Sequence, residues 1–449
     1  MRRPATRLTS MALAALGFIL GRQAAAAEAN YQLYDEIKSS HAIVGPLVGH
    51  VTDTTASIWA YAGPRSTPVV LEIAELGSRG ADDDGAPYRA RIEQQPDPAK
   101  HHEVEFTVEG LRPQTTYAFA VRLADDPSAV APGTFTTAPP CGQRAKFRVA
   151  VSSCFGNAYR RQDGRTSAQR EYVNQSWKLL MDRGPDLQLL VGDNVYADST
   201  DYNHLWDSHV LERVHNQPFA LAARSMPTYA VWDDHDYGPN NSDGTAKGKD
   251  ESLRAFYEVF ANPPRQGGGT GIYTSFSWGG VDFFLLDGRY HRSPDDAPNN
   301  DQKRYLGDEQ FDWLVEQLKA SKAPFKVLVN GSTWNASRDD GWRIYRFERR
   351  RLWQAIVENK IEGVVFVSGD IHRCDLPSHP PEPDGGYLMP EIISSGLGSH
   401  GKYDKLGFVI VDFDVTLDDP VMTARVIDGD DCESLTRRVK ASELRVRTD

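Results

Sequence analysis

The sequence predicts a β-sandwich near the start of the chain, followed by a layered α/β domain. Apolar residues alternate with polar ones over 104–108, and large apolar residues recur at every second position over 117–121, which is the period of a half-buried strand. Beyond a proline-containing linker at 136–140, strand-like runs that are apolar on both faces alternate with helix-like stretches, as in α/β domains. The two domains are therefore expected over residues 40–138 and 145–430.

Composition places the chain among ordinary globular proteins. It has 449 residues, of which 40% are apolar and 25% charged, so a sizeable core is possible. The 62 acidic residues outnumber the 50 basic ones and give a formal net charge of -12. This balance argues against a nucleic-acid-binding surface, which needs a basic face. Clustered carboxylates at a cation site are compatible with it, as is a solvated acidic surface.

The first residues read as a signal peptide over residues 1–27. Arg2 and Arg3 precede a short apolar run, Met11 to Leu20, and small residues follow at 24–27. The run is about half of the ~20 residues that a transmembrane helix needs, and no later segment is long and apolar enough to span a membrane. The sequence predicts export to the periplasm or secretion, and the arginine pair leaves a twin-arginine route open.

The first domain carries a recognisable corner between two of its expected strands. Leu111, Pro113, Thr115 and Tyr117 follow the spacing L-x-P-x-T-x-Y. This spacing resembles the tyrosine corner of fibronectin type III sandwiches, in which the phenol hydroxyl bonds back to the chain. The resemblance implies a fibronectin type III-like fold and says nothing of catalysis.

The second domain is expected to contain six buried strands and at least four helices. An apolar stripe at positions 311, 314, 315 and 318 has helical spacing. Further helices are expected near 169–181, 253–260 and 348–357. The expected strands are Phe147 to Ser153, Asp186 to Gly192, Thr228 to Trp232, Val281 to Leu286, Phe325 to Val329 and Gly363 to Gly369.

Residues that can bind metals follow four of these strands. They lie in the segments SSCFG, GDNVYAD, WDDHD and SGDIH, which contain Cys154, Asp193, Asp234 and Asp370 with His372. Ligands of layered α/β folds bind beyond the carboxyl ends of the strands, and carboxylates brought together there repel one another unless cations compensate them.

Each of these segments alone has a plainer explanation. A Gly-Asp pair is common, a single His after a strand is usually structural, and Cys154 alone would more often be a small buried apolar residue. Three acids and a His directly after a strand are harder to dismiss, because they are costly to bury unpaired. Taken together and in this order, the segments predict a metal cluster.

The ordered set SSCFG, GDNVYAD, WDDHDYG, LLDGRY and SGDIH resembles the alkaline phosphatase D (PhoD-like) family of metallophosphoesterases. The resemblance extends over about residues 40 to 430. It implies a four-layer α/β sandwich after the β domain. The implied activity is hydrolysis of phosphate mono- or diesters by metal-activated water, with an alkaline optimum.

The resemblance also implies a ligand set. Cys154, Asp193, Tyr196 and His372 would hold ferric iron, Fe(3+), because a thiolate and a phenolate suit a highly charged metal. Asp193 would bridge to a second site, completed by Asp234 and Asp370, whose oxygen donors suit calcium, Ca(2+). Cys154, Asp234 and Asp370 depart from the broader metallophosphoesterase pattern and favour this pair of metals over zinc or manganese.

Three further residues are candidates near the substrate. His235 is expected to protonate the leaving group or to hold a phosphate oxygen, with a structural role as the alternative. Arg289 would contact phosphate in a bidentate manner or, equally, form a buried ion pair with Asp287 or another acid. Asn330 ends a strand near the position of a common metal ligand and is a weaker candidate.

Two other functions stay open on the sequence. One is a phospholipase D-like lipid phosphodiesterase that uses the same metals. The other is a non-catalytic, metal-binding protein of the adhesion type, to which the β domain alone would be suited. The pairing of Cys141, Cys374 and Cys432 is also left open.

Overall fold

The computed structural model describes residues 43–63, 66–78, 88–126, 128–156, 167–266, 269–336, 340–382, 385–398 and 407–447. The expected signal peptide at 1–27 lies outside these residues. In the part of the chain described, no helix combines the length and the apolar composition that a membrane crossing needs.

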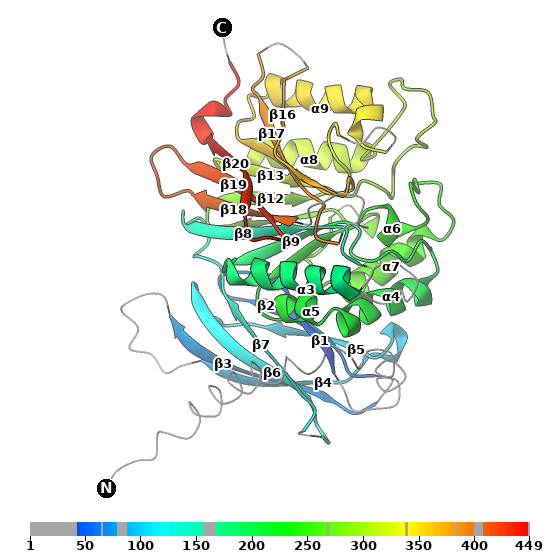
Figure 1. The fold of residues 1–449 in the computed structure, drawn as a ribbon, viewed down its shortest axis with the longest axis vertical. Coiled ribbons are helices and arrows are strands. Elements are labelled where there is room, and N and C mark those ends of the chain that lie inside the picture. Colours follow the sequence, from blue (N-terminus) through cyan, green and yellow to red (C-terminus); the bar gives the residue numbers. More distant parts are fainter. Residues whose placement is uncertain are drawn as a thin grey trace.

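The N-terminal region is rich in strands and forms one end of the molecule (Figure 1). The half-buried strand predicted over 104–108 is present. Its side chains alternate between the two faces, with Val104, Phe106 and Val108 buried and Glu105 and Thr107 exposed. One antiparallel sheet contains β1 (Val44–Val51), β2 (Ala56–Tyr61) and β5 (Glu103–Val108). The other contains β4 (Arg89–Gln94), β3 (Val69–Ser78), β6 (Thr115–Leu123) and β7 (Val130–Thr136), and a short 3-10 helix, η2 (Pro98–Lys100), precedes β5.

The corner predicted between β5 and β6 is present. The ring of Tyr117 is fully buried, and its hydroxyl oxygen accepts a hydrogen bond of 2.8 Å from the backbone N–H of Arg112. The phenol therefore bonds back to the chain five residues upstream and holds the turn into β6.

The rest of the chain is built around two mixed sheets. In the first sheet the order is β10-β9-β8-β18-β19-β20, with β8, β9 and β10 parallel. Its strands are β8 (Lys146–Ser152), β9 (Leu187–Val191), β10 (Thr228–Val231), β18 (Gly407–Asp414), β19 (Val421–Asp428) and β20 (Glu433–Lys440).

The second sheet has the order β11-β12-β13-β14-β17-β15, with β12, β13, β14 and β17 parallel. Its strands are β11 (Thr274–Trp278), β12 (Val281–Leu285), β13 (Lys326–Val329), β14 (Val364–Ser368), β17 (Met389–Ser394) and β15 (Cys374–Asp375), and β16 (Ser378–His379) pairs with β17. All six strands predicted from apolar runs are therefore confirmed, each within one or two residues.

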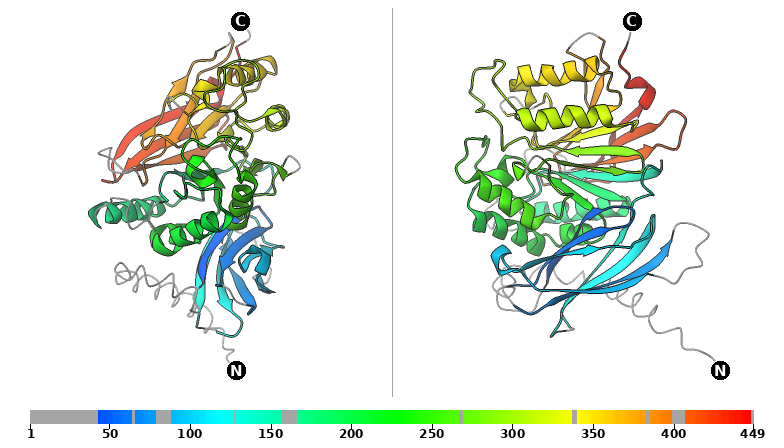
Figure 2. Two further views of the ribbon diagram at one scale, coloured as in Figure 1. Left: turned by 90° about the vertical axis from the view of Figure 1, so that its right-hand side faces the viewer. Right: turned by 180° about the vertical axis from the view of Figure 1, so that it is seen from behind.

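The two sheets face each other, and helices flank the pair on both outer sides (Figures 1 and 2). Helices α8 (Asp308–Ala320) and α9 (Arg346–Glu358) lie beyond the second sheet. Beyond the first sheet, toward the N-terminal strands, lie α3 (Ser167–Asp182) and α5 (Gln217–Ala223), with α4 (Tyr202–His215) and α7 (Lys249–Val259) beside them. Short helical turns are α6 (Asp234–Tyr237), η4 (Trp342–Ile344) and η5 (Ala441–Glu443).

Aromatic side chains fill the space between the two sheets. Phe147 of β8 stacks on Phe413 of β18 with ring centroids 5.1 Å apart, and Phe283 of β12 approaches the ring of Phe413 at 6.2 Å. All three rings are buried. Burial of such a side chain is worth about 1.5–3 kcal/mol, so this contact fixes the spacing of the sheets.

The N-terminal strands pack closely on the α/β region through β1. His50 donates its backbone N–H to the carbonyl of Ala261 at 2.6 Å. A Cβ on the neighbouring Gly49 would lie 2.1 Å from that carbonyl oxygen, so only glycine permits this approach. The hydroxyl of Tyr229, on β10, accepts the backbone N–H of Val51 at 3.3 Å. The two regions are thus joined by backbone contacts as well as by side chains.

Candidate metal centre

The candidate ligands meet where the parallel strands of both sheets end. Cys154 and Asp193 lie two residues beyond β8 and β9, and Asp370 lies two residues beyond β14 of the other sheet. The loop after β14 reaches the first sheet because Gly369 has no side chain. A Cβ there would lie 2.5 Å from the carbonyl oxygen of Val191. Residues far apart in sequence are therefore brought to one edge of the paired sheets.

Four different donor groups form the first part of the centre. Ligand atoms of Cys154, Asp193 and His372 lie within 4.8 Å of one another. The Sγ of Cys154 is 3.3 Å from Oδ2 of Asp193, and the hydroxyl of Tyr196 is 3.0 Å from Nε2 of His372. A thiol, a carboxylate, a phenol and an imidazole thus face one another, as the sequence predicts.

Carboxylates dominate the second part of the centre. Asp193 also groups with Asp234 and His235, so its carboxylate takes part in two clusters, as expected of a bridging ligand. Asp370 groups with Asp233 and Asp340 instead of with Asp234. The charge of Asp234 is also among those that raise the pKa of Asp370, so the two groups of acids are adjacent, and a site shared by Asp234 and Asp370 stays a prediction.

The backbone at the candidate ligands is held in an unusual conformation. Cys154, Asp193, Asp370 and His372 have φ angles of 57°, 50°, 72° and 53°, which lie in the left-handed region. Each such residue costs on the order of 1–3 kcal/mol, and strain of this kind persists where the surrounding structure over-determines it, often at functional sites. The loops are therefore shaped to direct these side chains inward.

Two acids of the centre are buried with part of their hydrogen-bonding capacity unused. Oδ1 of Asp193 and Oδ2 of Asp370 are buried and have no hydrogen-bond partner among the described residues. Burial, and then neighbouring acids, raise the pKa of both carboxyl groups well above the usual range. Burial and the charge of Asp193 likewise raise the pKa of the Cys154 thiol. Buried anionic donors with open lone pairs are what a bound cation requires, so the residues present fit a metal centre.

Asp234 differs from the other acids because the chain already supplies its counter-charge. Burial works against its ionisation, but the guanidinium of Arg289 and the ring of His235 outweigh burial and lower the pKa to about 2. Its Oδ2 accepts the backbone N–H of Asn241 at 2.7 Å. Asp234 is therefore an ionised donor at neutral pH.

Comparison with known proteins assigns the family. The family model described as PhoD-like phosphatase matches residues 149–428. The chain belongs to the PhoD-like phosphatase family. It is 24% identical over 322 residues to alkaline phosphatase D of Bacillus subtilis (strain 168), a match that covers 61% of this chain and 54% of that protein. The chain thus matches about half the length of this curated relative.

Solved structures agree with this PhoD-like assignment at the level of fold. A structure of PhoD superposes with a TM-score of 0.68 at 17% identity and covers 88% of this chain and 91% of that chain. The purple acid phosphatase PPD1 from yellow lupin (Lupinus luteus) seeds superposes with a TM-score of 0.63 at 14% identity, covering 89% and 74%. The PhoD-like fold therefore includes the N-terminal strands as well as the paired sheets.

The imidazole of His235 is anchored at the rim of this PhoD-like centre. Its Nδ1 is hydrogen-bonded to Oδ1 of Asp198, which lies in the loop after β9. Burial works to lower the pKa of His235, but the hydrogen bond to Asp198 and the charges of Asp193 and Asp234 outweigh it and raise the pKa to about 9. The sequence does not single out Asp198, although it ends the GDNVYAD segment.

Arg289 occupies the second of its two predicted roles in the structure, a buried ion pair. Its side chain is fully buried, with Nε donating to Asp233 at 2.7 Å and Nη1 and Nη2 reaching the two carboxylate oxygens of Asp340 at 3.1 and 2.5 Å. Asp287, the partner named from sequence, instead accepts the backbone N–H of Arg289 at 2.8 Å. With its guanidinium held between acids, Arg289 serves the PhoD-like site as an internal counter-charge.

Asn330 directly follows β13. Its side chain is fully buried, and its Nδ2 donates to the hydroxyl of Tyr305 at 2.8 Å and to the carbonyl of Ser332 at 2.7 Å. These contacts shape the loop after β13. Oδ1 of Asn330 has no hydrogen-bond partner among the described residues, and a contact of Asn330 with substrate stays a prediction.

Sequence reasoning overlooks Asp340 and Arg292. Both oxygens of Asp340 receive guanidinium groups, one from Arg289 and the other shared with Arg292. Asp340 lies in the irregular segment between β13 and α9, where it follows no apolar run. A strand-end pattern therefore cannot find it, and its position becomes clear only from the folded contacts.

The four cysteines are all free thiols. Cys154 is buried in the centre, Cys374 is partly buried, and Cys141 and Cys432 are exposed. The pairing that the sequence leaves open is therefore absent among these four residues.

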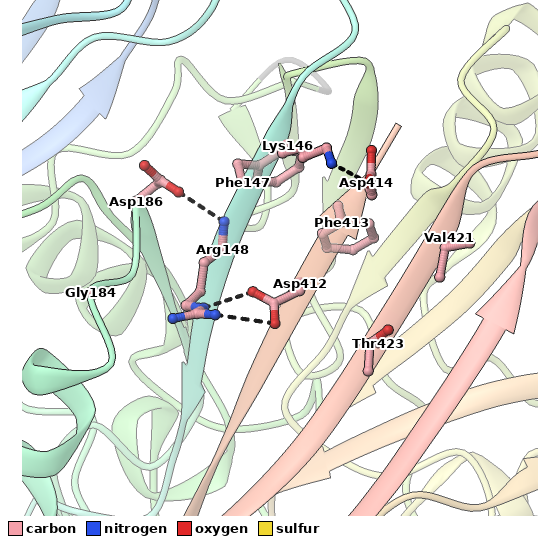
Figure 3. Close-up of a pocket in the computed structure, with 10 residues that line it drawn as sticks. All are labelled: Lys146, Phe147, Arg148, Gly184, Asp186, Asp412, Phe413, Asp414, Val421 and Thr423. Atoms are coloured by element: carbon pink, nitrogen blue, oxygen red, sulfur yellow. Dashed lines mark hydrogen bonds and ion pairs between the residues drawn. The ribbon is translucent and has the colours of Figure 1, made fainter. Parts of the chain in front are cut away.

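A surface pocket of about 460 Å³ lies away from the centre (Figure 3). It is lined by residues at the start of β8, whereas the ligands follow the other end of that strand. Its charged groups are already paired, with Arg148 on Asp412 at 2.7 Å and Lys146 on Asp414 at 2.8 Å. This pocket is separate from the PhoD-like centre.

Proposed function

We propose that the chain hydrolyses phosphate mono- or diesters at a centre of two metal sites. The ligands of Fe(3+) would be Cys154, Asp193, Tyr196 and His372. The ligands of Ca(2+) would be Asp193, Asp234 and Asp370. The observation that carries the proposal is the convergence of these side chains at one sheet edge, with buried carboxylate oxygens left without partners. A non-catalytic role is harder to reconcile with a complete donor set.

The two halves of the donor set suit different cations. A thiolate and a phenolate are anionic donors that match a small, highly charged metal. Carboxylate oxygens match calcium, which accepts hard donors in flexible geometry. The carboxylate of Asp193 lies in both groups and is suited to joining them.

The residues of the chain supply the remaining parts of the reaction. Two cations held by these ligands would neutralise phosphate oxygens and supply an activated water as the nucleophile. His235 would give a proton to the departing alkoxide from Nε2, and the hydrogen bond of its Nδ1 to Asp198 supports this role. Arg289 keeps Asp233 and Asp340 compensated, so that their charges do not repel the phosphate.

We also propose the domain layout and cellular destination that the sequence suggests. The tyrosine corner at Tyr117 supports a fibronectin type III-like domain over 40–138, followed by the phosphoesterase domain over 145–430. The basic and apolar start of the chain supports export to the periplasm or beyond by a signal peptide at 1–27.

Elemental analysis of the purified chain, together with assays on an aryl phosphate, an aryl phosphodiester and phospholipid vesicles, tests the function. We expect bound iron and calcium and turnover of the aryl substrates. Asp193→Ala should abolish turnover with the fold intact, whereas Asp418→Ala, at an exposed position, should leave it unchanged. Turnover of vesicles alone would assign a lipid phosphodiesterase, and metal-loaded protein inactive on all three would contradict the proposal.

A further inference from the structure

Ser395 links two of the candidate ligands without being one itself. It follows β17 directly and is fully buried. Its Oγ lies 2.9 Å from the Sγ of Cys154 and accepts the backbone N–H of His372 at 2.8 Å. Cys154 follows a strand of the first sheet and His372 follows a strand of the second, so the hydroxyl of Ser395 lies at the junction of the two sheets.

The direction of each hydrogen bond follows from counting protons. A serine hydroxyl has one proton to give and two lone pairs. Because Oγ of Ser395 accepts from His372, its own proton is available for the sulfur of Cys154. Ser153 is the other hydroxyl near this sulfur, at 3.2 Å, but it donates its proton to the carbonyl of Ser394 at 2.9 Å.

We propose that Ser395 is a positioning residue that donates a hydrogen bond to the thiolate of Cys154 and thereby tunes the metal held there. The inference rests on the proposed function, in which this thiolate is a ligand. A hydrogen bond to a ligating sulfur withdraws electron density from it, which is a recognised means of setting the properties of a bound metal. It also fixes the sulfur relative to the loop that carries His372.

Cobalt(II) is a suitable probe because its thiolate complexes have a sulfur-to-metal charge-transfer band. The full chain is stripped of metal and loaded with cobalt(II) alone. Removal of the hydrogen bond in Ser395→Ala should raise the energy of the sulfur electrons and move the band to longer wavelength. Ser395→Thr keeps a hydroxyl and should restore the native band, and Ser153→Ala should leave the band in place because that hydroxyl points its proton elsewhere.

The outcomes separate this inference from the function on which it rests. A band that stays in place in Ser395→Ala, or that moves as far in Ser153→Ala, overturns the role of Ser395 and leaves thiolate ligation standing. Cobalt bound without any sulfur-to-metal band overturns both the role of Ser395 and the thiolate ligation by Cys154 on which it rests. If Ser395→Ala does not fold, the hydrogen bond can be tested in the native chain loaded with cobalt. Its metal–sulfur stretching frequency should shift between H₂O and D₂O. An unshifted frequency overturns the hydrogen bond.

Discussion

At the scale of single residues, the centre is notable for buried groups that lack partners. Most buried polar atoms in proteins are hydrogen-bonded, because an unpaired one costs free energy. Asp193 and Asp370 each keep one buried oxygen open, as Glu348 does in α9, whereas Asp233 and Asp340 are closely paired. Unlike Glu348, the carboxylates of Asp193 and Asp370 lie among other candidate ligands, so their open oxygens are suited to a cation.

The phenol of Tyr196 gives the ligand scheme a visible signature. A phenolate bound to ferric iron absorbs visible light, so the iron-loaded chain should be coloured. Tyr196→Phe should lose this absorption and retain less iron, because its hydroxyl faces Nε2 of His372. Tyr202→Phe, whose hydroxyl bonds to Glu258 instead, is the control and should keep its colour. Absorption spectra with iron analysis check this, and an unchanged band in Tyr196→Phe would remove the phenolate from the scheme.

The carboxylate of Asp198 should affect turnover through the imidazole of His235, to which it is hydrogen-bonded. Asp198→Asn weakens the hold on Nδ1 of His235 and the protonation of that ring, so we expect kcat to fall about 100-fold with little change in KM. Asp201→Asn removes the same charge three residues away and keeps the N-cap of α4, so it should retain native kcat. Steady-state kinetics on the aryl phosphodiester measures both variants. Equal kcat in the two would show that His235 acts without Asp198.

At the scale of elements, the turn into β6 depends on one hydroxyl. Tyr117→Phe removes the acceptor of the Arg112 N–H and should lower the free energy of unfolding by about 1–2 kcal/mol. Tyr88→Phe is the matched control, because its hydroxyl bonds to the carbonyl of Glu109 near the surface and should contribute less. Denaturant unfolding of both variants gives the comparison. A Tyr117→Phe loss no larger than that of Tyr88→Phe would show that the corner is dispensable here.

Helix α9 is tied to the segment before α8 by a buried acid whose protonation depends on pH. Glu348 accepts the backbone N–H groups of Tyr305 and Leu306 at 3.0 and 2.7 Å, yet burial raises its pKa from 4.5 to about 7. A raised pKa means that the folded state favours the protonated form. The contribution of Glu348 to the stability of the fold is therefore fully present below pH 4.5 and is lost as the pH rises through 7.

Substitution of this acid isolates its contribution. Glu348→Gln is neutral throughout, so its stability relative to the native chain should rise by about 1–3 kcal/mol between pH 5 and pH 8. Glu316→Gln, at an exposed position of α8, should show no such trend. Unfolding measurements across this pH range check the slope. A flat difference for Glu348→Gln would mean that Glu348 ionises normally in the fold.

The elements that sequence predicts well are those with a strong local signal. β9 and β14 are buried along their whole length, and their apolar runs mark them clearly. By contrast, α4 is missed because its buried face includes His209, Glu212 and Arg213, so no clear apolar stripe marks it. The strand-end ligands are found for the same reason as the strands, whereas Asp340 and Ser395 are functional only through contacts made after folding.

At the scale of the whole molecule, the centre lies where two sheets meet, and these sheets are also joined by apolar contacts, by hydrogen bonds of Ser394 and by the ion pair of Arg289 with Asp233. Strands of the first sheet are followed by Cys154, Asp193 and Asp234. A strand of the second sheet is followed by Asp370 and His372. Cations bound between them would therefore tie the sheets together at this edge. Without cations, the same acids would face one another across the junction and push the edge apart.

Removal of metal should accordingly lower the stability of the entire fold. Ligands that bind only the native state stabilise it by mass action, and a few kcal/mol lost in this way corresponds to a fall in Tm of about 5–10 °C. Thermal unfolding of the chain before and after chelation, with metal content measured in parallel, tests this. Asp370→Asn removes one of the repelling charges at the second sheet. Chelation should therefore lower the Tm of this variant by less than it lowers the Tm of the native chain. If metal leaves with no change in Tm, the direct contacts between the sheets are sufficient to hold them together, and the centre serves chemistry without supporting the fold.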